Sequence, residues 1–158
     1  MSEIIIHIFV DADACPVKDE VVRVAERHAL IATYVSNSWM RLPDSLYVKR
    51  SIVADGPDAA DDWIAERIGA NDIVVTQDIP LAGRCLKQGA RAISTYGKPF
   101  TPDNIGMALA MRDLKSHLRE TGDLQGGNPG FTRNDRSKFL QALEHAVQEI
   151  KRGPLRNL

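Results

Sequence analysis

Short apolar runs alternate along the chain with longer segments in which apolar residues recur every three or four positions. The clearest run, Ile4–Val10, is almost continuously β-branched, which is typical of a strand buried on both faces of a parallel sheet. Similar runs predict four further strands. These are expected at residues 31–35, 47–54, 72–76 and 90–95.

Helical spacing is found between most of these runs. The first predicted helix extends from Pro16 to His28, with proline at its first position. Thr132 and Asp135 have the spacing of a capping box at the start of the last helix. Residues 38–46 have no helical period. The remaining helices are expected to begin near Asp58, Asp78 and Thr101.

The alternation of strands and helices predicts an α/β fold with a single open, mostly parallel sheet of about five strands. Helices on both faces would give it three layers. We expect one domain over residues 1–152, a frayed tail at 153–158 and a mobile loop at Gly126–Gly130.

Composition narrows the classes of protein that are possible. The 158 residues are 44% hydrophobic and carry a net charge of −1, which excludes a polycation held on nucleic acid by bulk charge. No run reaches the roughly 18 apolar residues of a membrane span. The opening apolar run lacks a basic leader, so no signal peptide is predicted. Cys15 and Cys85 have no CxxC spacing, which favours a reducing, cytoplasmic location.

Carboxylates gather where the predicted strands end. Parallel strands bring their carboxyl ends to one side of the sheet, where ligands bind. Hard oxygen ligands in such a place suit Mg²⁺ or Mn²⁺. Like-charged pairs on one helix face cost roughly 0.2–0.5 kcal/mol each, and a bound cation would relieve them. The predicted metal ligands are Asp11, Asp13, Asp58, Asp61, Asp62 and Asp78.

A structural role is the alternative for each aspartate taken alone, since aspartate is common at helix N-caps and turns. The local charge supports the group: residues 55–78 hold seven acidic and one basic residue, a net −6, whereas residues 131–158 have a net +3. An acidic segment at residues 55–78 with a basic segment beside it suits a phosphodiester polymer such as RNA. A solvated helix face is the alternative for the basic segment. The predicted substrate-binding residues are Arg133, Arg136 and Lys138.

Three motifs carry a resemblance to a known family. Residues 11–18 (DADACPVK), 56–64 (GPDAADDWI) and 74–82 (VVTQDIPLA) resemble the YaiI/YqxD family of uncharacterised bacterial proteins. The Gly126–Gly127 loop and the segment 133–136 also fit. The match extends through about residue 150.

That family is similar to PIN-like and NYN-type nuclease domains, in which acidic residues hold Mg²⁺ or Mn²⁺ and RNA is hydrolysed. The resemblance implies a PIN-like fold and a divalent-metal-dependent nuclease, with Asp13 and Asp61 as additional acids. A metal-activated water would attack the phosphorus. The catalytic residues that it implies are Asp11, Asp58, Asp62 and Asp78.

Other chemistry is less well represented. Cys15 lies at a predicted helix start, where the helix dipole lowers a thiol pKa, but no base is paired with it. The histidines are expected to be structural or solvated. They are His7, His28, His117 and His145.

Three other functions stay open. Asp11 and Asp13 resemble the start of a haloacid-dehalogenase phosphatase, although Pro16 leaves no room for its hairpin insert. Asp55, Thr76 and Lys98 are placed much as in a phosphoreceiver domain, although residues 38–46 are short for its helix. The third is a non-catalytic module that binds nucleic acid through a metal ion and does not cleave it.

Overall fold

A computed structural model describes residues 4–13, 15–54, 56, 58–121 and 130–153, with side chains at all of these positions except 112–121. The Gly126–Gly127 loop and the tail beyond Gly153 lie outside these ranges. The strands are β1 His7–Asp11, β2 Ile31–Ser36, β3 Val48–Ile52, β4 Ile73–Val75, β5 Arg91–Ile93 and β6 Pro99–Phe100. The helices are α1 Lys18–His28, α2 Ala59–Arg67, α3 Ile79–Lys87, α4 Pro102–Thr121 and α5 Arg133–Lys151.

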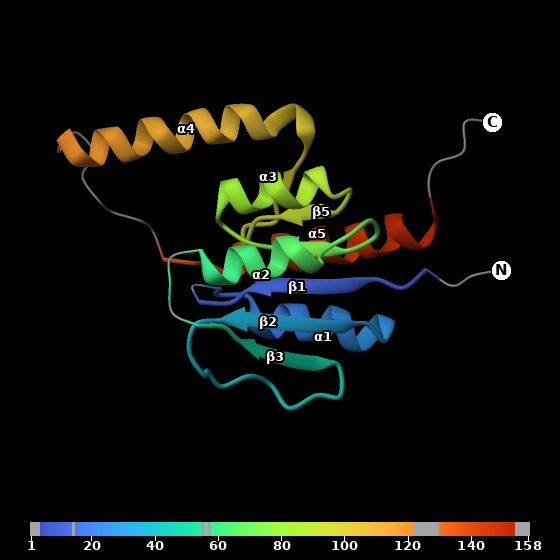
Figure 1. The fold of residues 1–158 in the computed structure, drawn as a ribbon. Helices are drawn as coiled ribbons and strands as arrows, with labels where there is room; N and C mark the ends of the chain where they lie inside the picture. The colour runs from blue at the N-terminus through green and yellow to red at the C-terminus, as the bar shows by residue number, and fades with distance from the viewer. Residues whose placement is uncertain (1–3, 14, 55, 57, 122–129, 154–158) are drawn as a thin grey trace, which may run out of the picture.

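The strands form one open sheet in the order β3-β2-β1-β4-β5-β6 (Figure 1). Every neighbouring pair is parallel except β5 and β6, which are antiparallel. The chain builds outward from β1 to β3 and then returns to place β4 on the other side of β1. The predicted α/β class and mostly parallel sheet are therefore confirmed, and the strand order reverses between β1 and β4.

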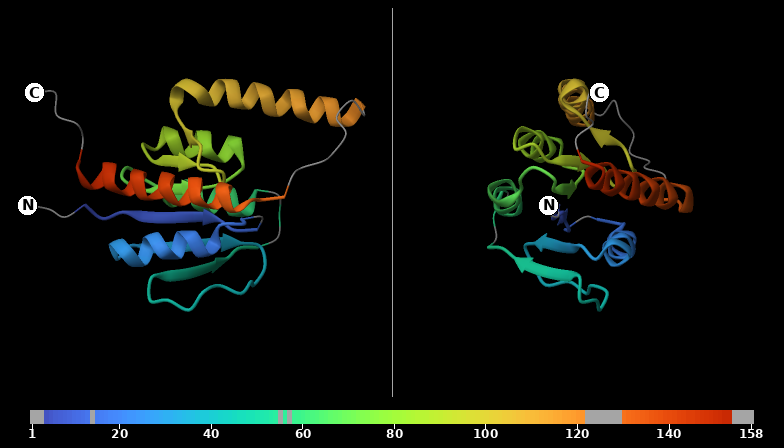
Figure 2. Two further views of the ribbon diagram at one scale, coloured as in Figure 1. Left: turned by 180° about the vertical axis from the view of Figure 1, so that it is seen from behind. Right: turned by 90° about the vertical axis from the view of Figure 1, so that its right-hand side faces the viewer.

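Helices cover both faces of the sheet (Figure 2). One core contains Ile8 and Val10 of β1, together with residues of α1 and α5. The other contains Phe9 and Val74, together with residues of α2 and α3. Consecutive side chains of β1 thus enter opposite cores, as expected for a central strand without a solvent face.

The structure corrects the start of the first predicted strand and adds a sixth strand. β1 begins at His7, where its pairing with β2 starts, and Ile5 before it is 82% exposed. The sixth strand, β6, was not predicted, because two residues are too few to show a period. A turn over residues 94–98 joins it to β5, and Gly97 with φ +84° lies in that turn.

The last two helices differ in their surroundings. α5 begins with the predicted capping box: Thr132 Oγ1 accepts from the Asp135 amide, and the Asp135 carboxylate accepts from the Thr132 amide. α4 packs on α3 and then extends past the sheet (Figure 1). None of the helices in the described ranges is long and apolar enough to cross a bilayer.

Candidate functional site

The carboxyl ends of β1 and β4 lie side by side at the reversal of strand order, the place where open α/β sheets bind ligands. Asp11 is the last residue of β1. Thr76 follows β4 directly, and Asp78 is the N-cap of α3. Asp61 belongs to the first turn of α2, which packs on the same sheet. We call Asp11, Asp61 and Asp78 the acidic site.

Thr76 joins two members of the acidic site. Its hydroxyl donates to Asp11 Oδ2 at 2.8 Å and accepts from the Asp78 backbone amide at 2.9 Å. The side chain is only 1% exposed. Because the hydroxyl has one donor and one acceptor in use, it fixes the Asp11 carboxylate relative to the loop that carries Asp78.

Asp78 is held by the helix that it caps. Its Oδ1 accepts from the Leu81 amide at 2.9 Å, and Pro80 lies in the first turn of α3. This is the usual N-cap arrangement, in which a carboxylate meets the positive end of the helix. Apart from this amide and its interaction with Asp61, the Asp78 carboxylate has no other hydrogen-bond partner in the described part of the chain, so it can still accept a ligand.

Asp61 lies among other carboxylates. Burial is the largest cause that raises the pKa of Asp61, to about 7, followed by the charges of Asp78, Asp11 and Asp58 and by a hydrogen bond with Asp78. Burial likewise raises the pKa of Asp11, against the opposing hydrogen bond from Thr76, and the charges of Asp78 and Asp13 raise it further. Burial and mutual repulsion thus disfavour the simultaneous ionisation of all three carboxyl groups of the acidic site near neutral pH.

The other predicted carboxylates have different surroundings. Asp62 forms an ion pair with Arg84 of α3 at 2.7 Å, and Asp13 accepts from the Asn37 amide at 3.3 Å. Asp58 is exposed at the N-cap of α2 without a side-chain capping bond. The structure therefore brings together Asp11, Asp61 and Asp78 with Asp58 nearby, while Asp13 and Asp62 have partners of their own.

The donor types suit a hard divalent cation, since carboxylate oxygens are the ligands that Mg²⁺ and Mn²⁺ prefer. Across the described positions, no three His, Cys, Asp or Glu side chains already have the arrangement that holds a metal ion. The Asp61 and Asp78 carboxyl groups are near enough to share a proton, which contributes to the raised pKa of Asp61. A cation would replace the proton between them.

The predicted substrate-binding residues are placed differently from one another. Arg133 is exposed at the start of α5. Arg136 donates to the Pro16 carbonyl at 2.6 Å and lies over the Phe131 ring. Its guanidinium thereby ties α5 to the loop after β1. Lys138 is exposed and lines a cavity on the α5 side of the sheet.

Cysteine and histidine chemistry finds no support at this site. Cys15 is buried, and burial raises the pKa of its thiol, which is opposite to the lowering that a helix start would give. Cys85 is fully buried in the core. His7 bonds Thr33 and His28 bonds Glu144, which fits structural roles. The side chain of His117 lies outside the described part of the chain.

Sequence reasoning gave two polar residues no part in this site: Thr76, which it used only for the phosphoreceiver alternative, and Gln77. Thr76 is the link just described, and its place directly after a predicted strand was the available signal. Gln77 Oε1 accepts from the Thr95 amide at 3.1 Å, which ties the loop before Asp78 to the end of β5. Neither bond follows from spacing along the chain, because each joins different strands.

The topology also bears on the other functions. Phosphoreceiver domains have the strand order 2-1-3-4-5, whereas here β3 lies beyond β2 and no helix joins them in residues 37–47. Asp55, the proposed acceptor, lies outside the described residues. α1 begins at Lys18, soon after β1, which leaves little room for a phosphatase hairpin insert.

Comparisons with known proteins give a family. Residues 9–149 match the family described as "Uncharacterized BCR, YaiI/YqxD family". A "UPF0178 protein" of Parvibaculum lavamentivorans is 61% identical over 148 residues, 94% of this chain and 97% of the relative. "UPF0178 protein Rru_A0086" of Rhodospirillum rubrum is 59% identical, covering 93% and 99%. "UPF0178 protein RPA2191" of Rhodopseudomonas palustris is 55% identical, covering 96% of each chain. The chain belongs to the YaiI/YqxD family of uncharacterised proteins.

Proposed function

We propose that this protein is a divalent-metal-dependent nuclease that hydrolyses phosphodiester bonds of RNA at the acidic site. The observation that carries the proposal is the meeting of Asp11, Asp61 and Asp78 at the reversal of strand order. Within the described residues, none of the three forms an ion pair with lysine or arginine. Their mutual repulsion is therefore left for a bound cation to relieve.

Asp11, Asp61 and Asp78 would hold the cation, with Asp58 able to contribute from the N-cap of α2. When bound, Mg²⁺ or Mn²⁺ lowers the pKa of water and neutralises charge on a phosphodiester. Thr76 acts as a positioning residue, because its hydroxyl orients Asp11 and holds the Asp78 loop. The pKa of Asp61, about 7, makes proton release accompany cation binding near neutral pH.

The choice of RNA rests on two supports. One is the similarity of the family motifs to PIN-like and NYN-type nucleases, which is itself part of the proposal. The other is the net positive charge of residues 131–158 in contrast to the net negative charge of residues 55–78. Arginine and lysine side chains of this kind bind the phosphates of a polymer without reading its sequence.

Cleavage of labelled single-stranded RNA, with Mg²⁺ or Mn²⁺ against excess chelator, tests the proposal. Asp78→Asn is the sharpest variant, because asparagine keeps the Oδ1 that caps α3 while removing the charge. Asp103→Asn, an exposed first-turn aspartate of α4, is the matched control. We expect metal-dependent cleavage that Asp78→Asn abolishes and Asp103→Asn leaves unchanged.

Calorimetric titration with Mn²⁺ provides the independent measurement. It should report binding to the unmodified protein and a much weaker response from Asp78→Asn. Absence of cleavage of any RNA or DNA, together with absence of cation binding, would overturn the proposal. Binding without cleavage would instead indicate a metal-dependent nucleic-acid-binding module.

A further inference from the structure

A cavity of about 1000 Å³ lies between α5 and the β5–β6 side of the sheet. This volume is at the upper end of the roughly 300–1000 Å³ of small-molecule sites. Two close approaches define the ends of the cavity. At one end, a Cβ added to Gly97 would lie 2.7 Å from the Lys138 carbonyl oxygen. At the other end, Arg91 and Glu149 form an ion pair at 2.7 Å.

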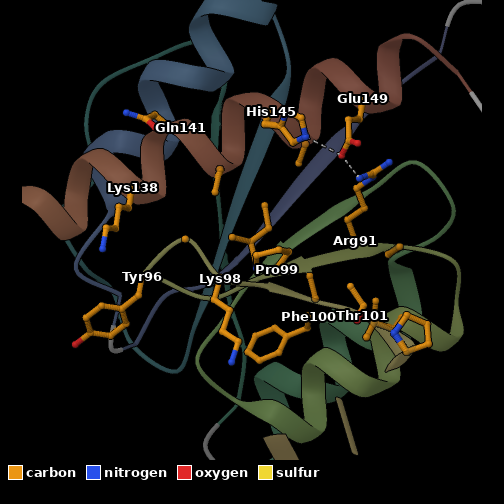
Figure 3. A pocket seen from close by; sticks show the side chains of 18 residues that line it. Arg91, Tyr96, Lys98, Pro99, Phe100, Thr101, Lys138, Gln141, His145 and Glu149 are labelled. Atoms are coloured by element: carbon orange, nitrogen blue, oxygen red, sulfur yellow. Dashed lines mark hydrogen bonds and ion pairs between the residues drawn. The ribbon is translucent and has the colours of Figure 1, made fainter. Parts of the chain in front are cut away.

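The middle of the cavity is apolar. Ile93 and Phe100 from the strands and Ala142 and Ala146 from α5 line it. Three of these four side chains are buried, and Ala142 is partly buried. Figure 3 shows Pro99 between the charged groups of the two ends and Phe100 beside Lys98. Such a wall suits a flat, weakly polar body such as a nucleobase.

The two ends differ in charge compensation. Arg91 is neutralised by Glu149, which also lies 3.4 Å from His145 (Figure 3). Lys98 and Lys138, at the other end, are exposed and form no ion pair with any of the described residues. The end with these two ammonium groups is therefore the place for an anion, with the Asp135 carboxylate as the acidic neighbour of Lys138.

An aromatic ring completes that end. Tyr96 is 45% exposed in the turn between β5 and β6, and its ring centre lies 5.1 Å from that of Phe131. Figure 3 shows Tyr96 on the same side of the cavity as Lys98 and Lys138. The two ammonium groups lie apart in Figure 3, so a phenol ring here suits a surface that stacks a base and binds the phosphates that flank it.

We infer that the cavity beside α5 binds one nucleotide of a single-stranded nucleic acid, with its two flanking phosphates at Lys98 and Lys138 and its base on Tyr96 and the apolar wall. The inference rests on the proposed function for the identity of the polymer. The turn that carries Tyr96 lies next to the acidic site, because Gln77 accepts from the Thr95 amide. A strand cleaved at Asp78 can therefore continue into the cavity.

Fluorescence anisotropy of a short labelled single-stranded RNA, measured in excess chelator, tests the inference without cleavage. The double variant Lys98→Gln and Lys138→Gln should weaken binding about tenfold, and should reduce the salt slope by about 0.7 for each lost phosphate contact. Tyr96→Ala should weaken binding at least about fivefold, as expected for one lost stacked base. Ala142→Trp, which fills the cavity, should do the same.

Matched controls come from the same surface types. Ser137→Trp places the same ring on an exposed position of α5 outside the cavity, and the pair Lys49→Gln and Lys87→Gln removes two exposed lysines elsewhere. These controls should retain full affinity. Equal losses in variants and controls, or affinities within about twofold of the unmodified protein in all cavity variants, would overturn the inference.

The two proposals fail in different ways. Cavity-dependent RNA binding in a protein that never cleaves RNA supports the cavity and refutes the nuclease. Metal-dependent cleavage whose KM is unchanged by the Lys98 and Lys138 substitutions supports the nuclease and refutes the cavity.

Discussion

Two half-buried aspartates at opposite ends of the same sheet show how neighbours decide the role of a carboxylate. Asp72 precedes β4 at the amino end, and Asp61 faces the carboxyl end from α2. Burial is the largest cause that raises the pKa of both. Asp72, however, accepts from the Gly69 amide at 2.9 Å and from the His7 amide at 3.1 Å. Asp61 meets other carboxylates instead.

The difference separates a structural carboxylate from a candidate ligand. Backbone N–H groups satisfy both oxygens of Asp72 and join the loop after α2 to the first residue of β1. With both oxygens already accepting backbone hydrogen bonds, the Asp72 carboxylate gains little from a further partner. The carboxylates of the acidic site raise one another's proton affinity, so that a cation has an unmet charge to neutralise. A buried carboxylate is therefore a candidate cation ligand only where no N–H group or basic side chain already compensates its charge.

The largest expected effect is on RNA cleavage, which should depend on Asp11 at the carboxyl end of the sheet and not on Asp72 at the amino end. Asp11→Asn should lower metal-dependent RNA cleavage about 100-fold or more, because it removes one preorganised charge from the reacting centre. Asp72→Asn should leave the cleavage rate per folded molecule unchanged. Initial rates at saturating Mn²⁺ measure both. A comparable loss in Asp72→Asn would contradict the distinction between the two ends.

The free energy of unfolding should instead depend more on Asp72 than on an aspartate at the carboxyl end of the sheet. Asp72→Ala leaves the amides of Gly69 and His7 without their acceptor and should lower the free energy of unfolding by about 1–3 kcal/mol. Asp58→Ala should change it by less than about 0.5 kcal/mol, since that exposed side chain makes no capping bond. Urea unfolding followed by circular dichroism gives both values. A loss in Asp72→Ala as small as that in Asp58→Ala would show that the hydrogen bonds of Asp72 contribute little to stability.

Asp61 should make stability depend on pH in the metal-free protein. Its folded-state pKa of about 7 lies above the ordinary 3.8, so the unfolded chain loses this proton first and stability falls as pH rises from about 4 to 7. Asp61→Asn removes that loss. Allowing for solvent screening, it should stabilise the protein by roughly 1 kcal/mol at pH 8, about 2–4 °C in Tm.

Thermal unfolding in chelator at pH 4 and pH 8 checks the effect of Asp61. The difference between Asp61→Asn and the unmodified protein should vanish at the lower pH. A gain that is equal at both pH values would come from packing rather than from charge. Adding Mn²⁺ should stabilise the unmodified protein more at pH 8 than at pH 5, because cation and proton compete.

The smallest effect is expected from the ion pair between Asp62 and Arg84. Both side chains are about half exposed, so a double-mutant cycle should give a coupling of about 0.2–1 kcal/mol. The family resemblance also implies a catalytic role for Asp62. A loss of cleavage in Asp62→Ala as large as in Asp11→Asn would show that this pair opens when RNA binds. A small loss would restrict the site to Asp11, Asp61 and Asp78.

Local patterns predicted most of the fold. The β-branched run before Asp11 became the central strand, and the spacing of Thr132 and Asp135 became a capping box. β6 escaped prediction because its two residues pair only through the turn that places them beside β5. The limits of β1 shifted because pairing with β2 decides where the strand begins.

The candidate site was predicted less completely than the fold. Helical spacing grouped Asp58, Asp61 and Asp62, but it could not tell that Asp62 meets Arg84 while Asp61 meets Asp78. Thr76 carried too little signal by itself, since its importance lies in bonds to residues of two other segments.

The amino-acid sequence by itself determined the α/β class, the helix starts and the presence of many aspartates at strand ends, because periodicity and capping act between residues a few positions apart. Only the tertiary structure decided which carboxylates share a space, which are neutralised and where the cavity beside α5 lies. Strand order and side-chain neighbours depend on segments far apart along the chain. The pKa of Asp61 is a property of those neighbours, and no local pattern contains it.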